Sequence, residues 1–305
     1  MKVALFGGSG FVGDNIINEL IEQNYKVYSL IRYGSEHKIS QFNKIKSIIG
    51  DIDNPTAVEQ TIMNAEAVIY NIGIIREYKS KGISFHQLHF EGLKKCVDMA
   101  EKFNVKRFIL MSANGVKKNG TGYQRTKYQA EEYLKASSLN WTIFRPSLIF
   151  GDSKGKQEFC SQLKKDMLSL PFPAPLFFDG LNVFNAGKFK MSPIHIKDVS
   201  KIFVKALSLR KISKQTYHLG GDNINWKEIL RIISIASNKE SKMFIPAPAI
   251  FIKIAASIFG NLLPVSREQL TMIMEGNVCN SEEVFGIFGI DKPITFSPEN
   301  LDYLS

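Results

Sequence analysis

The segment KVALFGGSGFVG, residues 2–13, decides the fold. Residues 3–6 are apolar and bounded by glycine, as in a buried parallel strand, and residues 11–22 have the spacing of an amphipathic helix. The glycines of the intervening turn allow a tight bend, let backbone N–H groups approach a diphosphate, and let the helix pack closely on the sheet. The positive end of that helix then faces the phosphates. The expected dinucleotide contacts are Gly7, Ser9, Gly10, Phe11, Val12 and Gly13.

Apolar runs alternate with helical patterns through the rest of the first half of the chain. Strands that alternate with helices indicate a parallel sheet covered on both faces. We therefore expect an α/β fold, with a Rossmann-type doubly wound parallel sheet as a dinucleotide-binding core over residues 1–151. The predicted strands are residues 3–6, 26–31, 45–49, 67–70, 107–111 and 141–144, and the predicted helices are residues 11–22, 85–103 and 123–136.

The pattern loosens after Gly151. Residues 170–178 contain three prolines and predict a loop, whereas residues 217–219 predict a short strand. We expect residues 152–305 to return strands and helices to the core and to form a smaller, mostly helical substrate or cap region over the carboxyl ends of the strands. Further helices are predicted at residues 196–209 and 226–236, and over much of the chain from residue 242.

Composition limits the function classes. The chain has 305 residues and a formal net charge of +10, and its three cysteines are too few and too scattered for a disulfide framework or a cysteine-ligated zinc site. No basic segment precedes a long apolar run at the N-terminus, so we expect no signal peptide. The charge itself indicates nucleic acid, an anionic membrane surface or phosphorylated ligands, or only a lysine-rich composition. No basic run interleaved with aromatic residues supports nucleic acid as a partner.

The end of the second predicted strand distinguishes the two nicotinamide cofactors. NAD(H) sites usually place an acidic residue there to accept a hydrogen bond from the ribose 2′-hydroxyl. This chain has Arg32 and no acid, with Lys38 nearby. Because a guanidinium suits a phosphate dianion, we favour NADP(H) over NAD(H). The alternative is an ordinary surface arginine.

Tyr123 and Lys127 open the predicted helix at residues 123–136. Residues four apart lie on one helix face, so the phenol and the ammonium can enter the same site. A nearby ammonium stabilises phenolate, and we expect it to lower the pKa of Tyr123 towards a range useful for proton transfer.

Together these stretches resemble the short-chain dehydrogenase/reductase superfamily, in its extended and atypical branch. The resemblance is closer still to the subfamily of the NAD(P)H-binding accessory subunit of respiratory complex I (alpha subcomplex subunit nine) and its bacterial relatives. It covers nearly the whole chain, and the last forty residues are the least distinctive. The matching stretches are the glycine loop, Arg32, residues 50–52, residues 68–75 with His89 and Gly92, residues 108–113, 123–127, 140–147, Gly151, residues 192–199 and residues 217–221.

The resemblance implies a role for each matching residue. The loop glycines would hold the diphosphate, Arg32 the adenosine 2′-phosphate, and Lys127 the nicotinamide ribose, while Tyr123 would donate or accept the proton. The remaining implied cofactor contacts are Asp51 and Ile52 beside the adenine, Asn71, Ile72 and Gly73 on the ribose and nicotinamide side, and Pro146 and Ser147 against the carboxamide.

One position departs from the family pattern. The reductases usually have a hydroxyl that steadies the substrate carbonyl, commonly two residues beyond the serine that ends the fifth strand. Here that place is Asn114, which can donate a hydrogen bond but cannot relay a proton. Ser112 is then either part of the catalytic set or a strand-end residue bonded to backbone. Hydride chemistry is possible, and in this subfamily the bound cofactor can be largely structural.

Three functions therefore stay open. The first is an NAD(P)H-dependent oxidoreductase acting on a carbonyl or quinone-like substrate, or a complex I accessory-like protein, in the cytoplasm or peripheral on the inner membrane. The second is a non-catalytic nucleotide-binding assembly or stability factor. The third is a nucleotide-sugar epimerase or dehydratase, against which Asn114 counts. We expect no metal site: His86 and His89 predict interior hydrogen bonding, and His195 with Asp198 a structural hydrogen bond.

The segment at residues 245–264 is strongly apolar. It contains two prolines and a lysine, so it is a poor membrane span. Either it is a helix buried in the C-terminal region or at an oligomer interface, or it docks on a membrane surface or a hydrophobic subunit. The predicted helical stripe is Ile250, Phe251, Ile254, Ala255 and Ile258.

Overall fold

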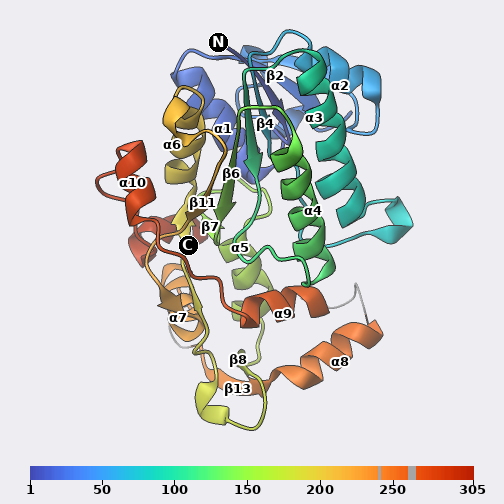
Figure 1. Cartoon of the computed structure of the whole chain (residues 1–305). Coiled ribbons are helices and arrows are strands. Elements are labelled where there is room, and N and C mark those ends of the chain that lie inside the picture. Colours follow the sequence, from blue (N-terminus) through green and yellow to red (C-terminus); the bar gives the residue numbers. More distant parts are fainter. Residues whose placement is uncertain (240–241, 260–265) are drawn as a thin grey trace.

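A seven-stranded parallel sheet forms the centre of the molecule (Figure 1). The computed structural model describes residues 1–239, 242–259 and 266–305. The strand order is β11-β6-β5-β4-β1-β2-β3, so the chain begins in the middle of the sheet and winds outward in both directions. The predicted Rossmann-type α/β class is confirmed. The strands are β1 (Lys2–Phe6), β2 (Lys26–Ile31), β3 (Lys46–Ile49), β4 (Ala67–Tyr70), β5 (Arg107–Met111), β6 (Trp141–Pro146) and β11 (Gln215–Leu219).

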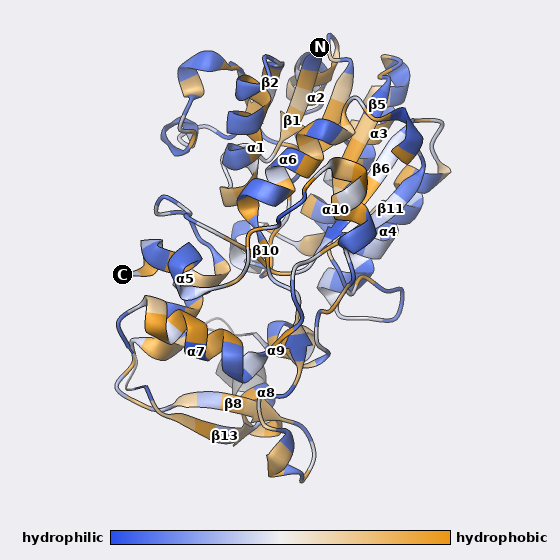
Figure 2. Cartoon of the chain, turned by 90° about the vertical axis from the view of Figure 1, so that its left-hand side faces the viewer, coloured by the Kyte–Doolittle hydropathy of each residue, from blue (hydrophilic) through white to orange (hydrophobic). Residues whose placement is uncertain are grey.

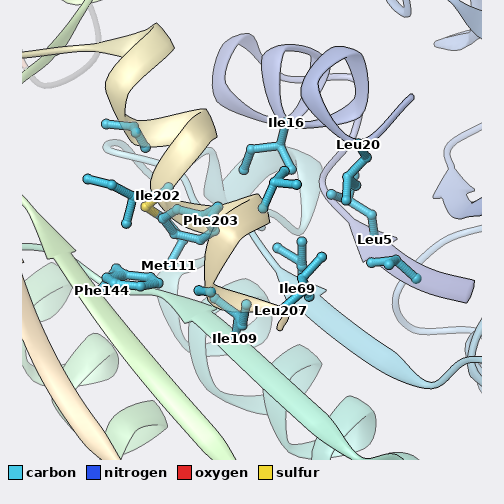
Figure 3. Close-up of a cluster of buried hydrophobic side chains, with 14 of the residues drawn as sticks. Leu5, Ile16, Leu20, Ile69, Ile109, Met111, Phe144, Ile202, Phe203 and Leu207 are labelled. Atoms are coloured by element: carbon cyan, nitrogen blue, oxygen red, sulfur yellow. The ribbon is translucent and has the colours of Figure 1, made fainter. Parts of the chain in front are cut away.

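Helices cover both faces of this sheet (Figure 1). One face packs against α1 (Phe11–Glu22), α6 (Ile196–Ala206) and α10 (Glu282–Phe288). The other packs against α2 (Pro55–Ile62), α3 (Gly92–Lys102) and α4 (Gly122–Ala136). Because apolar side chains of each strand alternate between the two faces, the sheet separates two buried clusters. Figure 3 shows the first, where Ile16 and Leu20 of α1 meet Ile202 and Phe203 of α6 above Ile69 and Ile109 of the sheet.

The second half of the chain supplies both sheet and cap. Strand β11 pairs with β6 in the main sheet, and α6 lies beside α1. The rest forms a cap below the carboxyl ends of the strands (Figure 1), around the fully buried Trp226. Its helices are α5 (Phe159–Leu163), α7 (Trp226–Ala236), α8 (Ala249–Phe259), α9 (Arg267–Met274), the π-helix η5 (Lys164–Leu168) and the 3₁₀ helices η6 (Val183–Asn185) and η9 (Pro298–Leu304).

Three two-stranded sheets accompany the main sheet in the described part of the chain. They pair β7 (Ile149–Phe150) with β10 (Ile194–His195), β9 (Lys190–Met191) with β12 (Ile224–Asn225), and β8 (Ala174–Phe178) with β13 (Phe244–Pro248). Short 3₁₀ helices complete the connections: η1 (Glu36–Lys38), η2 (Phe42–Lys44), η3 (Lys79–Lys81) and η7 (Arg210–Ile212).

The largest differences from the predicted elements lie in the cap. Residues 174–178, predicted as loop, form β8, and residues 244–248, predicted as the start of a helix, form its partner β13. The two strands are about seventy residues apart in the chain, so neither local pattern contains the partner that makes it a strand. Prolines are tolerated because each strand lies at the edge of a two-stranded sheet.

The predicted helix at residues 85–103 is divided. Its first part is a π-helix, η4 (His86–Glu91), which continues into α3. π-turns inside α-helices often occur at functional sites, and this one places His89 against Thr126 of α4. The other predicted elements have the bounds that the structure shows or differ from them at one end by one to three residues, and α2 was not predicted.

Candidate functional site

The glycine loop has the geometry of a phosphate cradle. Gly7 has φ +91°, and a Cβ on it would lie 2.8 Å from Asn71 O. A Cβ on Gly13 would lie 2.1 Å from Gly7 O, because α1 crosses directly over the first turn. Gly10 is the N-cap residue of α1, and no side chain caps that helix end. The uncapped N–H groups at the end of a helix bind phosphate readily, so the loop fits a dinucleotide diphosphate.

The residues that follow β2 and β3, expected beside the adenosine, include exposed basic side chains. Arg32, directly after β2, is exposed, as is Lys38 of η1. Asp51 follows β3 and is exposed, whereas Ile52 is buried. The structure thus brings Arg32 and the Asp51–Ile52 turn to the same edge as the glycine loop, since β1, β2 and β3 are adjacent and parallel.

Lys127 lies beside the turn that follows β4. Its side chain is almost fully buried, and its Nζ donates a hydrogen bond to Met111 O at 3.0 Å. A Cβ on Gly73 would lie 3.4 Å from that Nζ, so the ammonium adjoins the Asn71–Gly73 turn after β4. Burial lowers the pKa of Lys127 to about 8. The predicted neighbourhood of Lys127 and Gly73 is therefore present in the fold.

Tyr123 does not have the expected acidity. Burial raises the pKa of Tyr123 to about 12, so the expected lowering by Lys127 is wrong. The physical reason is that burial removes water from the phenolate, while the ammonium of Lys127 donates to Met111 O. The ring of Tyr123 packs edge-on against Phe85 and His89, with centroids 5.7 and 5.2 Å apart.

His89 links the turn after β4 to α4 through two hydrogen bonds. It is 1% exposed, and its Nε2 accepts a hydrogen bond from Ile74 N at 3.2 Å. Because Nε2 is an acceptor, the proton of the neutral ring is on Nδ1, which donates to Thr126 Oγ1 at 3.0 Å. Burial, with a smaller contribution from Lys127, lowers the pKa of His89 to about 2 and keeps the ring neutral. The interior hydrogen bonding predicted for His89 is confirmed. His86 instead lies at the surface, 3.3 Å from Glu91.

Ser112 is bound to a buried ion pair that the sequence analysis missed. Its Oγ donates to Glu131 Oε1 at 2.5 Å, and Glu131, fully buried, also accepts from Arg145 Nε at 2.9 Å. Glu131 follows Lys127 by one turn of α4, and Arg145 precedes Pro146 on β6. In the sequence, the spacing of four residues between Lys127 and Glu131 could have indicated that Glu131 lies on the same helix face as Lys127. Ser112 is thus bonded to a side chain and not, as one alternative held, to backbone.

Asn114 and Ser147 are engaged by the C-terminal strap, which we define as residues 275–281. Asn114 Nδ2 donates to Val278 O at 3.0 Å, and its Oδ1 lies 2.7 Å from His218 Nδ1. Ser147 Oγ donates to Asn277 O at 2.7 Å. The strap is also fixed to α4, because Glu275 accepts from Gln124 Nε2 at 2.9 Å. Nothing local in the sequence indicates these contacts.

His195 and Asp198 each have a structural partner, but not one another. His195 Nδ1 accepts from Lys197 N and caps α6, and Asp198 accepts from Ile294 N at 2.8 Å. In the part of the chain that the structure describes, no group of three or more histidine, cysteine, aspartate or glutamate side chains is arranged to hold a metal ion.

The model of the NAD(P)H-binding family matches residues 7–167, more than half of the chain. The chain belongs to this family. It is 26% identical to the NADH-ubiquinone oxidoreductase 40 kDa subunit of Neurospora crassa, over 71% of this chain and 55% of that one. It is 24% identical to the NADH dehydrogenase [ubiquinone] 1 alpha subcomplex subunit 9 of Dictyostelium discoideum, over 83% of this chain and 68% of that one. The match thus spans about half the length of the Neurospora relative, and the resemblance inferred from the motifs is confirmed.

Other similarities extend over the cap. The photosystem II assembly factor Ycf39 of Trieres chinensis is 21% identical over 85% of this chain and 76% of its own. Among solved structures, gox2253 has a TM-score of 0.76 at 19% identity, covering 100% of this chain and 96% of that one. The enzyme WbmH of Bordetella bronchiseptica in complex with NAD+ has a TM-score of 0.75 at 17% identity, covering 99% and 96%. At these identities the structural likeness shows the fold.

Proposed function

We propose that the chain binds NADP(H) as a resident cofactor that stabilises it as an accessory component of a respiratory NADH dehydrogenase. The diphosphate lies against the loop of Gly7, Gly10 and Gly13, and Arg32 binds the 2′-phosphate. The observation that carries the proposal is the uncapped, Cβ-free turn at the start of α1, open to backbone recognition of phosphate. The other proposed contacts are Ser9, Phe11, Val12, Asp51, Ile52, Asn71, Ile72, Gly73, Lys127, Pro146 and Ser147.

The state of the catalytic edge supports a resident cofactor over rapid turnover. The hydroxyl of Ser112 is engaged by Glu131, and the amide of Asn114 by the C-terminal strap and His218. The Ser112 hydroxyl would have to leave Glu131 before it could donate to a carbonyl substrate, and one of the two amide hydrogens of Asn114 is already used by Val278 O. The names of the Neurospora and Dictyostelium relatives, both subunits of an NADH dehydrogenase, support association with a respiratory complex. A location at the periphery of the inner membrane is part of this proposal.

A second candidate function is an NAD(P)H-dependent oxidoreductase acting on a carbonyl or quinone-like substrate. It is favoured by Tyr123 and Lys127, which lie one helical turn apart beside the Asn71–Gly73 turn. When bound, a reduced nicotinamide would be the source of the hydride for the substrate carbon. Tyr123 would donate its phenolic proton to the substrate oxygen, and Lys127, with a pKa of about 8, would stabilise the phenolate that remains. No observation favours an epimerase over these two.

The experiment is to purify the full chain, release and identify any bound nucleotide by mass spectrometry, and measure NADPH and NADH affinities. We expect NADPH to bind more tightly, and Arg32→Ala to weaken NADPH by roughly tenfold or more because a charge-assisted hydrogen bond is lost. Lys44→Ala, an exposed cation on the same connection, is the matched control and leaves the affinity unchanged. Equal binding of NADH would overturn the cofactor preference.

Turnover distinguishes the two candidate functions. Carbonyls and quinones are screened with the wild-type chain and with Tyr123→Phe. Tight NADPH binding without turnover supports the resident cofactor. Turnover that Tyr123→Phe abolishes while NADPH affinity persists supports the oxidoreductase, and turnover that Tyr123→Phe leaves unchanged removes Tyr123 as the proton donor.

A further inference from the structure

The far end of the cap exposes large apolar side chains from three separate segments. Two are the connections on either side of β8, and the third runs through β13 into α8. Leu181 is fully exposed, Phe184 81%, and Phe172 69%. Such side chains rarely gather on the surface of a monomer without a partner. We define the cap-tip surface as Phe172, Leu181, Phe184, Met243, Ile250 and Phe251.

Pairing of β8 with β13 brings these segments to one end of the molecule. The strands pair in parallel from Ala174 and Phe244 to Phe178 and Pro248. Lys242 Nζ donates to Leu170 O at 2.5 Å near their first residues, and Lys253 Nζ to Asp179 Oδ1 at 3.2 Å just beyond their last. Figure 1 places this pair at the end opposite the N-terminus, and Figure 2 shows it as an apolar layer.

The α8 part of this surface bears on whether residues 245–264 form a helix buried in the C-terminal region. Ile250, Phe251 and Ile254 are exposed, so this part of the predicted stripe is not buried in the cap. The side chains of Ala255 and Ile258, and residues 260–264, lie outside the described residues. No helix among residues 1–239, 242–259 and 266–305 is long and apolar enough to cross a membrane.

Two lysines lie beside the apolar side chains at the Phe172 end of the surface. A groove of about 400 Å³ opens between residues 168–173 and Met243, and Lys239 and Lys242 line it. Lys253 of α8 is paired with Asp179. This end of the surface is therefore apolar and cationic together.

We propose that the cap-tip surface docks on the surface of an anionic phospholipid bilayer. Phe172, Phe184 and Phe251 enter the interface between headgroups and acyl chains, while Lys239 and Lys242 contact lipid phosphates. Charge is what favours lipid over a protein partner. Lysine is depleted in protein–protein interfaces, whereas each lysine near an anionic leaflet adds to membrane affinity. The proposal does not depend on cofactor binding or on turnover.

The test is flotation of the full chain with vesicles of phosphatidylcholine alone or mixed with phosphatidylglycerol, at low and high salt. We expect binding to the mixed vesicles only, weakened by salt because the attraction to the charged leaflet is screened. Phe184→Ser lowers binding by about tenfold, the effect of withdrawing one large apolar side chain. Met63→Ser, an exposed apolar residue at the end of α2, is its matched control and leaves binding unchanged.

Two double lysine variants distinguish a local contact of Lys239 and Lys242 with the membrane from an effect of the net charge of the chain. Lys239→Gln/Lys242→Gln lowers binding by about thirtyfold, at roughly fivefold per lysine. Lys26→Gln/Lys106→Gln removes the same charge from exposed positions near the other end of the sheet and has a much smaller effect. Unchanged thermal unfolding of all four variants shows that they are folded.

Three results would overturn the proposal: no binding to the mixed vesicles, equal loss from both lysine pairs, or insensitivity to Phe184→Ser. Light scattering gives a further check. If the chain is a dimer that Phe184→Ser converts to a monomer and it does not float with vesicles, the surface is an interface between copies of this chain, and the membrane proposal is wrong.

Discussion

The proposed cofactor edge, at residues 7–13, and the proposed substrate edge, around Ser112 and Asn114, are built in different ways. The glycine loop is formed by residues 7–13, and its shape depends on backbone contacts within that stretch and with Asn71. The substrate side depends on side chains that meet across the fold: Ser112 with Glu131, and Asn114 with His218 and Val278. The first edge is thus encoded locally, and the second by contacts between distant segments. Substitutions on the two edges should differ accordingly.

The largest effect is expected at the cofactor edge. Gly13→Ala places a Cβ 2.1 Å from Gly7 O, and backbone on both sides leaves nothing free to move. We expect a loss of roughly 4 kcal/mol or more in unfolding free energy, measured by chemical denaturation. Gly286→Ala in α10, where a Cβ meets no atom within 4 Å, is the matched control and should be neutral or stabilising. A much smaller loss of unfolding free energy for Gly13→Ala would contradict the tight packing of the glycine loop.

The next effect tests the substrate edge. Glu131→Gln leaves Arg145 with a largely buried, uncompensated charge and should cost about 3 kcal/mol in denaturant unfolding. Its exposed neighbour Glu132 provides the control: Glu132→Gln should change stability by less than about 0.5 kcal/mol. Should the two variants prove equally stable, the ion pair would not organise this edge.

His89 connects the two edges and has a pH signature. Its folded pKa of about 2 lies below the unfolded value, so its neutral form contributes stability above about pH 6.5 that is lost as pH falls. Between pH 6 and 5 we expect the unfolding free energy of the wild type to fall more steeply than that of His89→Gln, by about 1.4 kcal/mol per pH unit. His37→Gln, at an exposed position, should leave the slope as it is. Parallel slopes for wild type and His89→Gln would contradict the assignment.

The smallest effect concerns the C-terminal strap. Lys117 Nζ lies 2.8 Å from Glu275 Oε1, and both side chains are substantially exposed. We expect Lys117→Ala to cost less than about 1 kcal/mol, since solvent screens such pairs. Asn114→Ala removes the bonds to Val278 and His218 and should loosen the strap more, seen as faster proteolysis near residues 275–281. If Lys117→Ala loosened it more, the exposed pair would be the principal anchor.

The cofactor half was predictable because its signals are periodic or tied to one short motif. β1, α1, β2, β4 and β5 follow from apolar runs and from the glycine turn between the first two. The Tyr123–Lys127 pair followed from helical spacing. The high pKa of Tyr123 did not, because it depends on how much water the fold removes from the phenol.

The sequence by itself determined the Rossmann-type core, the diphosphate loop and the basic end of β2, since each depends on residues that are neighbours in the chain. Only the tertiary structure decided that β8 pairs with β13, that Glu131 holds Ser112, and that residues 275–281 close over Asn114 and Ser147. Those contacts join residues between 19 and about 160 positions apart. They form only when folding brings these distant segments together, and a buried member such as Glu131 then needs its partners because an unpaired buried polar group costs free energy.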